Sequence, residues 1–278
     1  MGADPLPIRR GFADVPHGQM HFRAAGAGAP LLLLHSSPGS AKQMERMIRS
    51  FAPQMRVIAP DTPGNGDSDP LPGDGHEITD LARAMLAFMD AQGIEAAHVY
   101  GSHTGAAIAA ELALLAPERV KGVMLDGLTD MQGAELDDAL SHYATPFEAD
   151  LDGSFLTRLF AYCRDQYLFY PWHDRTREAR RDGGLPPADD LAGLVLETMK
   201  ARTSYHLNYH AAFRWQPHER LPLLIVPALL MASEADPLFE TTQALSTPVP
   251  FAPLPRFDAP DFAEARRIVM ARFMGLEA

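Results

Sequence analysis

The sequence is poor in cysteine, in cationic residues and in long apolar runs. Its one cysteine, Cys163, excludes an internal disulfide, and we expect a small buried side chain in a reducing compartment. The 24 Lys and Arg residues are outnumbered by 36 Asp and Glu residues, so the formal net charge is −12. This acidic excess argues against nucleic acid or an anionic membrane surface as a partner. A small, largely uncharged organic molecule is the expected ligand.

Segments that would direct the chain to a membrane are also lacking. No apolar run approaches the ~18 residues that a membrane-spanning helix needs. The N-terminal stretch MGADPLPIRR has neither the apolar run of a secretory signal nor the Ser or Thr of a myristoylation signal. These features predict a cytoplasmic protein.

Short apolar runs alternate with amphipathic segments over the first 128 residues. Residues 11–28 alternate between apolar and polar side chains around a turn, which predicts a β-hairpin. The predicted strands that follow are 30–35, 55–61, 96–101 and 121–127, and the helices between them are 40–52, 78–93 and 104–120. This order predicts an α/β protein, with a mostly parallel sheet and helices on both faces.

The alternation stops at about Leu128 and resumes at about residue 219. The intervening residues are predicted to be helical, and a strand at 221–232, a weaker strand at 249–255 and a final helix follow them. A helical insertion in a parallel sheet is expected to cover the carboxyl ends of the strands, where such sheets bind ligands. We therefore predict a core of residues 1–128 and 219–278 and a helical lid of residues 129–218.

Three motifs follow successive predicted strands. They are His35-Ser36-Ser37-Pro38, the loop APDTPGNGDSD at 59–69, and Gly101-Ser102-His103-Thr104-Gly105. Together they resemble the α/β-hydrolase fold, most closely the lidded bacterial branch of epoxide hydrolases, haloalkane dehalogenases and carbon–carbon bond hydrolases. The resemblance implies that fold with an inserted helical lid. It also implies an enzyme that acts on a small molecule without a cofactor or a metal.

The third motif has a histidine where the family carries its nucleophile. In this fold the central residue lies on a strained turn from strand to helix, which requires tiny neighbours, here both glycine. The turn directs the side chain of His103 into the pocket beside the positive end of a helix. The resemblance implies an oxyanion hole formed by the backbone N–H groups of Ser37 and Thr104. Ser102 lies one position early and is the less favoured nucleophile.

The acid of a hydrolase triad is present, but its histidine is not. The resemblance places a carboxylate at Asp236 in MASEADPLFE, with Asp126 in MLDG at the alternative position. The histidine expected near residues 255–258 is missing, and the last histidine of the chain is His218. The standard mechanism is therefore excluded. We predict instead that His103 hydrogen-bonds Asp236 and acts as a general base.

Other candidate residues lie beside the first motif and on the lid. Tyr205 and Tyr209, like His206 and His210, are spaced i, i+4 and so lie on the same side of a helix. The predicted substrate-contacting residues are His35, Ser36, Tyr170, Trp172, Tyr205, His206, Tyr209 and His210. Packing of the lid on the core is the alternative role for each, and a lid histidine is an alternative base. The basic run 175–182 is expected to be the solvated face of a helix.

The preferred function is hydrolysis of an ester, a lactone or a similar bond. A lyase, isomerase or decarboxylase without a cofactor is the enzymatic alternative, and a catalytically inactive small-molecule-binding protein is the other. A metal held by His35, His103 and an aspartate has no recognised ligand motif in its favour.

Overall fold

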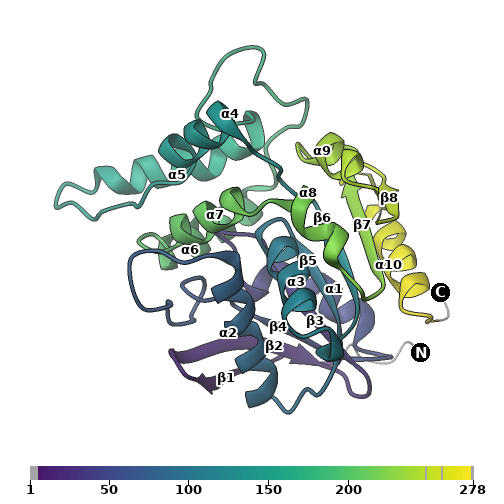
Figure 1. The fold of residues 1–278 in the computed structure, drawn as a ribbon. Coiled ribbons are helices and arrows are strands. Elements are labelled where there is room, and N and C mark those ends of the chain that lie inside the picture. The colour runs from purple at the N-terminus through teal and green to yellow at the C-terminus, as the bar shows by residue number, and fades with distance from the viewer. Residues whose placement is uncertain (1–5, 248, 258, 277–278) are drawn as a thin grey trace.

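An eight-stranded sheet runs through the computed structural model, which describes residues 6–247, 249–257 and 259–276 (Figure 1). The strands lie in the order β1-β2-β4-β3-β5-β6-β7-β8. The pairs β1–β2 and β2–β4 are antiparallel, and the other neighbours are parallel. The strands are β1 (Arg9–Val15), β2 (Gly18–Ala25), β3 (Pro30–Leu34), β4 (Arg56–Pro60), β5 (Ala97–Ser102), β6 (Val120–Asp126), β7 (Ala228–Ser233) and β8 (Phe251–Leu254). The predicted α/β fold with a mostly parallel sheet is confirmed.

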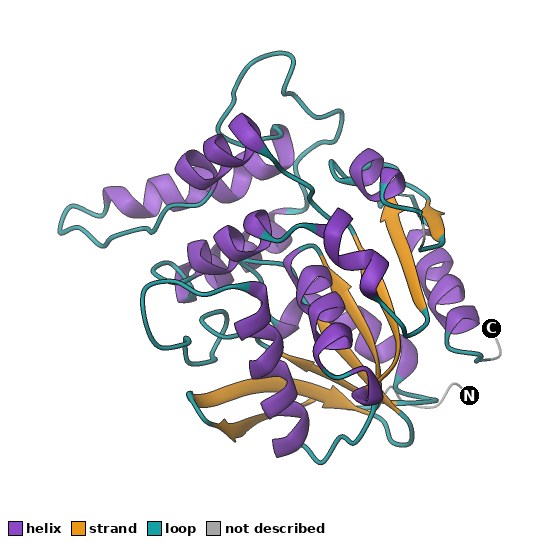
Figure 2. Ribbon diagram, viewed as in Figure 1, coloured by secondary structure: helices purple, strands orange, loops and turns teal. Residues whose placement is uncertain are grey.

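Helices cover both faces of this sheet (Figure 2). Leu32 and Leu34 of β3 pack into one apolar cluster, while Leu31 and Leu33 pack into the other. Because successive side chains of a strand point to opposite faces, a run of leucines requires cover on both sides. The helices of the first face are α2 (Ile78–Ala91) and α3 (Thr104–Leu115), and those of the second are α1 (Glu45–Phe51) and α10 (Phe262–Phe273).

One predicted strand was too long. The strand expected over 221–232 begins only at Ala228, and the preceding residues form a 3₁₀ turn and a loop. Pro222 and Pro227 have no N–H to donate to a neighbouring strand, so this part of the segment does not enter the ladder. Ile225 accordingly lies in solvent, with 81% of its surface exposed.

Between β6 and β7 the chain forms a group of helices on one side of the core (Figure 1). Their apolar cluster contains Leu159, Cys163 and Tyr205, all fully buried. Cys163 is a small buried side chain, as expected, and burial raises the pKa of its thiol to about 11. The helices are α4 (Gly133–Asp138), α5 (Ser154–Leu168), α6 (Ala188–Lys200) and α7 (Tyr205–Arg214), and α8 (Pro217–Arg220) and α9 (Phe239–Ala244) follow. No helix among the described residues has both the length and the apolar character needed to cross a bilayer.

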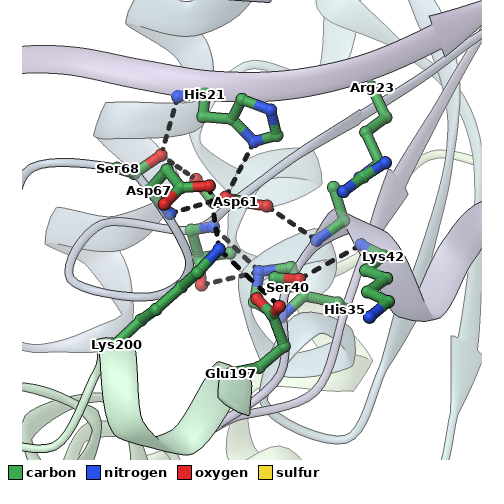
Figure 3. Close-up of polar contacts among 12 residues, drawn as sticks. His21, Arg23, His35, Ser40, Lys42, Asp61, Asp67, Ser68, Glu197 and Lys200 are labelled. Atoms are coloured by element: carbon green, nitrogen blue, oxygen red, sulfur yellow. Dashed lines mark hydrogen bonds and ion pairs between the residues drawn. The ribbon is translucent and has the colours of Figure 1, made fainter. Parts of the chain in front are cut away.

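The loop at 61–69, which contains the second motif, joins these helices to the core (Figure 3). The buried carboxylate of Asp61 accepts the N–H groups of Ala41 at 2.7 Å and Asp67 at 2.9 Å, which fixes the loop. Lys200 of α6 donates to the Asp67 carboxylate at 3.0 Å. The second motif therefore has a structural role, since its carboxylate satisfies backbone donors and its rim carries an ion pair to α6.

Candidate active site

The third motif forms a one-residue turn between β5 and α3. His103 has φ 50° and ψ −113°, and it is the only non-glycine residue with positive φ in the described part of the chain. A Cβ at Gly101 would lie 2.0 Å from the carbonyl oxygen of Gly105, and one at Gly105 would lie 2.4 Å from that of Leu34. Neither position can hold a side chain without movement of the backbone. Backbone of this kind costs on the order of 1–3 kcal/mol and is found mostly at functional positions.

His103 is hydrogen-bonded to Asp236, as the sequence predicted. The distance from Nε2 of His103 to Oδ2 of Asp236 is 2.7 Å. An ionised carboxylate only accepts, so Nε2 carries the proton and the lone pair of the neutral ring is on Nδ1. The other carboxylate oxygen, Oδ1, accepts the N–H of Leu238 at 2.8 Å, which fixes the carboxylate after β7.

The pKa of His103 is raised and that of Asp236 is lowered. Burial lowers the pKa of His103, but the charge of Asp236 and its hydrogen bond outweigh burial and raise the pKa above its ordinary 6.5. Burial raises the pKa of Asp236, but the charge and hydrogen bond of His103 bring it below its ordinary 3.8. Both shifts favour an imidazolium–carboxylate pair.

The alternative acid, Asp126, is bonded elsewhere. Its carboxylate accepts the hydroxyl of Tyr100 at 2.5 Å and lies 4.0 Å from the guanidinium of Arg266. Burial raises the pKa of Asp126. Its backbone carbonyl, however, accepts the N–H of His103 at 2.9 Å. Asp126 therefore holds the turn in place, while Asp236 holds the imidazole.

The pair opens into a cavity of about 270 Å³ between the core and the segment predicted as the lid. The His103 side chain is 39% exposed and that of Asp236 is 16% exposed, so the ring faces the cavity while the carboxylate lies behind it. The other predicted site residues that line the cavity are Ser36, Ser37, Thr104, Tyr170 and Tyr209.

Five predicted substrate-contacting residues are not in the lining: His35, Trp172, Tyr205, His206 and His210. His35 is 1% exposed; its Nδ1 donates to the carbonyl of Ser36 at 2.9 Å, and its Nε2 accepts the N–H of Thr62 at 2.9 Å. Burial lowers the pKa of His35, in keeping with a neutral structural imidazole.

The four other residues of this group lie in the segment predicted as the lid, and three of them hydrogen-bond backbone carbonyls of that segment. Trp172 donates its indole N–H to the carbonyl of Tyr143 at 2.7 Å. The hydroxyl of Tyr205 donates to the carbonyl of Thr145 at 2.8 Å. Nε2 of His210 donates to the carbonyl of Ala144 at 3.0 Å, and its ring lies 5.8 Å from that of His206. Neither His206 nor His210 lines the cavity, so neither is placed as its base.

Several cavity residues were not identified from the sequence: Thr129, Tyr143, Gln166, Tyr167, Arg181 and Phe257. The expectation of a helix over 175–182 is wrong, because this segment is a loop between α5 and α6. Most of its residues are exposed, as expected, but Arg181 lines the cavity. A loop has no periodicity from which the direction of a side chain can be read. Phe257 lies where the family's histidine was expected, and the neighbouring Asp258 is outside the described residues.

Histidine and carboxylate ligand atoms come together at two places outside this cavity. Among the described residues these groups are Asp138, His142 and His173, and His21, Asp61 and Asp67. In the second group, Asp61 already accepts two backbone N–H groups. The cavity lining offers one imidazole and one carboxylate, fewer than the three protein ligands of a catalytic zinc site.

Comparisons with known proteins agree with the fold. The family model of the α/β hydrolase fold matches residues 29–249. The putative carbamate hydrolase RutD of Azorhizobium caulinodans is 32% identical over 238 residues, which are 82% of this chain and 81% of the relative. The dihydrolipoyllysine-residue acetyltransferase component of the acetoin cleaving system of Cupriavidus necator is 37% identical over 115 residues, 41% of this chain but 30% of that protein.

Solved structures show the same fold. An epoxide hydrolase from an endophytic Streptomyces superposes with a TM-score of 0.75 at 18% identity, covering 98% of this chain and 96% of that one. The family model confirms the resemblance to the α/β-hydrolase fold that was inferred from the three motifs, and this structure shows the same fold.

The Gly105→Ala substitution tests the constraint at the turn. We expect it to lower the free energy of unfolding by about 1–3 kcal/mol, because the new methyl group would meet the carbonyl of Leu34. The control is Gly75→Ala, at an exposed site with no atom within 4 Å of the added Cβ, and its effect should stay within about 0.5 kcal/mol. Urea denaturation measures both, and equal free energies for the two variants would contradict the constraint.

The pKa of His103 tests the electrostatics of the pair. NMR titration of the ring should give a pKa above 6.5, and in the Asp236→Asn variant it should fall, because burial remains and the opposing charge is gone. An unchanged pKa would show that the carboxylate does not act on the ring.

The same shifts predict how stability depends on pH. The raised pKa of His103 contributes stability that is complete below 6.5 and is lost as the pH rises through that raised value. The lowered pKa of Asp236 contributes stability that is present above 3.8 and is lost as the pH falls through its lowered value. Unfolding free energies should therefore differ most between the unmodified protein and the Asp236→Asn variant between pH 3.8 and 6.5.

Proposed function

The chain belongs to the α/β-hydrolase fold family, and from this premise we propose that it hydrolyses an ester- or lactone-type bond in a small organic molecule. The observation that carries the proposal is the 2.7 Å hydrogen bond between His103 and Asp236, with the imidazole at the nucleophile position of the fold. RutD, a relative that aligns over most of the chain, is named as a putative carbamate hydrolase, and this name supports a hydrolytic reaction.

His103 acts as a general base through Nδ1. Asp236 accepts from Nε2–H, so the lone pair of the neutral ring lies on the nitrogen that the pair leaves free. Nδ1 is bonded to Cγ and thus lies one bond further from the backbone than a serine hydroxyl would. A water molecule therefore takes the place of the covalent nucleophile. General bases of this type contribute about 10²- to 10⁴-fold to the rate.

We expect two backbone N–H groups at the cavity wall to stabilise the negative charge of the intermediate. Thr104 is the first residue of α3, so its N–H has no acceptor within the helix, and the helix N-terminus favours an anion. Ser37 lines the same cavity, and we expect its N–H to be the second donor.

The reaction then balances with water as the co-substrate. The oxygen of water bonds to the carbonyl carbon while its proton passes to Nδ1 of His103. Collapse of the tetrahedral intermediate breaks the bond to the leaving oxygen, and the imidazolium returns the proton to that oxygen. The products are a carboxylic acid and an alcohol, or one hydroxy acid when the substrate is a lactone.

The His103→Ala variant tests the assignment of the base. On a panel of 4-nitrophenyl esters and γ-lactones, we expect kcat/KM to fall by about 10²- to 10⁴-fold, because the proton acceptor is removed. Ser102→Ala is the matched control and should change kcat/KM by less than about threefold. An acyl group found on Ser102 by mass spectrometry during turnover would refute water activation by His103. Ligand binding without any turnover, unaffected by His103→Ala, would identify a binding protein.

The dependence of the rate on pH tests the role of Asp236. Because the base must be neutral, kcat/KM should rise with pH through a midpoint above 6.5. Asp236→Asn should move this midpoint to lower pH and reduce kcat, since the ring loses both the charge that raises its pKa and its fixed orientation. Asp138→Asn, at an exposed position outside the cavity lining, should leave the profile unchanged. A midpoint that Asp236→Asn does not move would rule out the pair as the titrating base.

A further inference from the structure

Among the described residues that line the cavity, Arg181 is the only Lys or Arg. Its guanidinium donates to the backbone carbonyls of Gln166 at 2.7 Å and Ala235 at 3.3 Å, and it lies 6.0 Å from the ring centre of Phe257. A guanidinium has five N–H donors, so several remain after these contacts. Among the described residues, no carboxylate lies within ion-pair distance of it.

Among the described lining residues, the one carboxylate is that of Asp236, and both of its oxygens are already hydrogen-bonded. Asp236 accepts from the ring of His103 and from the N–H of Leu238. The charge of Arg181 nevertheless acts on the cavity, because it helps to lower the pKa of Asp236 and opposes the rise in the pKa of His103. A half-buried cation with free donors and no counter-ion has lost hydration without replacement, and an anionic ligand would supply it.

Arg181 also stands at the junction of two cavities. A second cavity of about 630 Å³ adjoins the first, and its lining includes the loop residues 178–187. Both cavities are lined by Tyr167, Tyr170, Arg181, Asp236, Pro237 and Phe257. A small molecule bound to the guanidinium can therefore extend toward His103 in the inner cavity and also has access to the outer cavity.

We propose that Arg181 binds a carboxylate of the substrate, so that the preferred substrates are acidic esters or lactones. The carboxylate lies at the junction of the two cavities, and the bond to be cleaved lies in the inner cavity beside His103. This inference rests on the proposed hydrolytic function for the position of that bond. The planar fork of an arginine matches the two oxygens of a carboxylate and forms charge-assisted hydrogen bonds with both.

The net charge of the chain makes this local cation decisive. At −12 the protein as a whole repels anions, so the binding of an acidic substrate needs a local cation. Arg180 and Arg256 line the outer cavity, but of the three arginines only Arg181 also lines the inner cavity with His103. Composition alone predicted a largely uncharged substrate, whereas Arg181 favours a substrate with one carboxylate.

A pair of esters of equal acyl length tests the proposal: 4-nitrophenyl butyrate, which is neutral, and 4-nitrophenyl hemisuccinate, which carries a carboxylate. We expect the unmodified enzyme to prefer the hemisuccinate. Arg181→Met should lower kcat/KM for the hemisuccinate by about 10- to 100-fold and for the butyrate by less than threefold. Arg177→Met, which removes the same charge from an exposed position of the same loop, should change neither value.

Two results would overturn the proposal. A preference of the unmodified enzyme for the butyrate would do so, and so would an equal loss on both esters in Arg181→Met, which would show that Arg181 acts only through the catalytic pair. If Arg181→Met does not fold, Arg181→Lys decides: it keeps the charge but not the fork, and its loss should be smaller and still confined to the hemisuccinate.

Binding of a non-hydrolysable analogue separates this proposal from the proposed function. N-(4-nitrophenyl)succinamic acid, the amide that corresponds to the hemisuccinate, should bind to the unmodified protein and to His103→Ala but more than tenfold more weakly to Arg181→Met, as measured by calorimetry. That result, without turnover of either ester, would keep the carboxylate site and refute the esterase function. Equal binding by the Arg181→Met variant, with turnover of the butyrate, would refute the carboxylate site alone.

Discussion

The backbone turn at His103 is the constraint on which the cavity depends. Its positive φ is held by two glycines that have no room for a side chain and by a hydrogen bond from the His103 N–H to the carbonyl of Asp126. The turn places the imidazole at the carboxyl edge of the sheet, and α3 begins at the next residue, Thr104, which lines the same cavity. The strain is sustained by the buried sheet and helix on either side.

The hydrogen bond between His103 and Asp236 depends on space as well as on charge. A Cβ at Gly127 would lie 2.7 Å from Cδ2 of His103, so the absence of a side chain at the end of β6 leaves room for the ring. Phe257 occupies the position where the fold family was expected to supply its histidine. The imidazole at the turn thus provides the ring that hydrogen-bonds the carboxylate of Asp236.

The two charges of the cavity act on the same ring in opposite directions. Asp236 raises the pKa of His103 and Arg181 lowers it, with the carboxylate the stronger because it is hydrogen-bonded to the ring. A carboxylate of the substrate on Arg181 would remove part of this opposition and make the ring a stronger base when the site is filled. Substrate recognition and proton transfer would then be coupled through one guanidinium.

The sequence by itself determined the fold, the turn and the partner of the imidazole. Each is encoded locally: strands alternate with helices, glycines flank His103, and Asp236 follows a strand whose carboxyl end meets the same edge of the sheet. The extent of β7 was misjudged where prolines interrupt an apolar run. Only the tertiary structure decided which residues of the segment predicted as the lid line the cavity, because the directions of their side chains depend on contacts with distant segments. Arg181 lies in a loop without periodicity, and it points into the cavity because carbonyls at residues 166 and 235, one on α5 and one after β7, hold its guanidinium there.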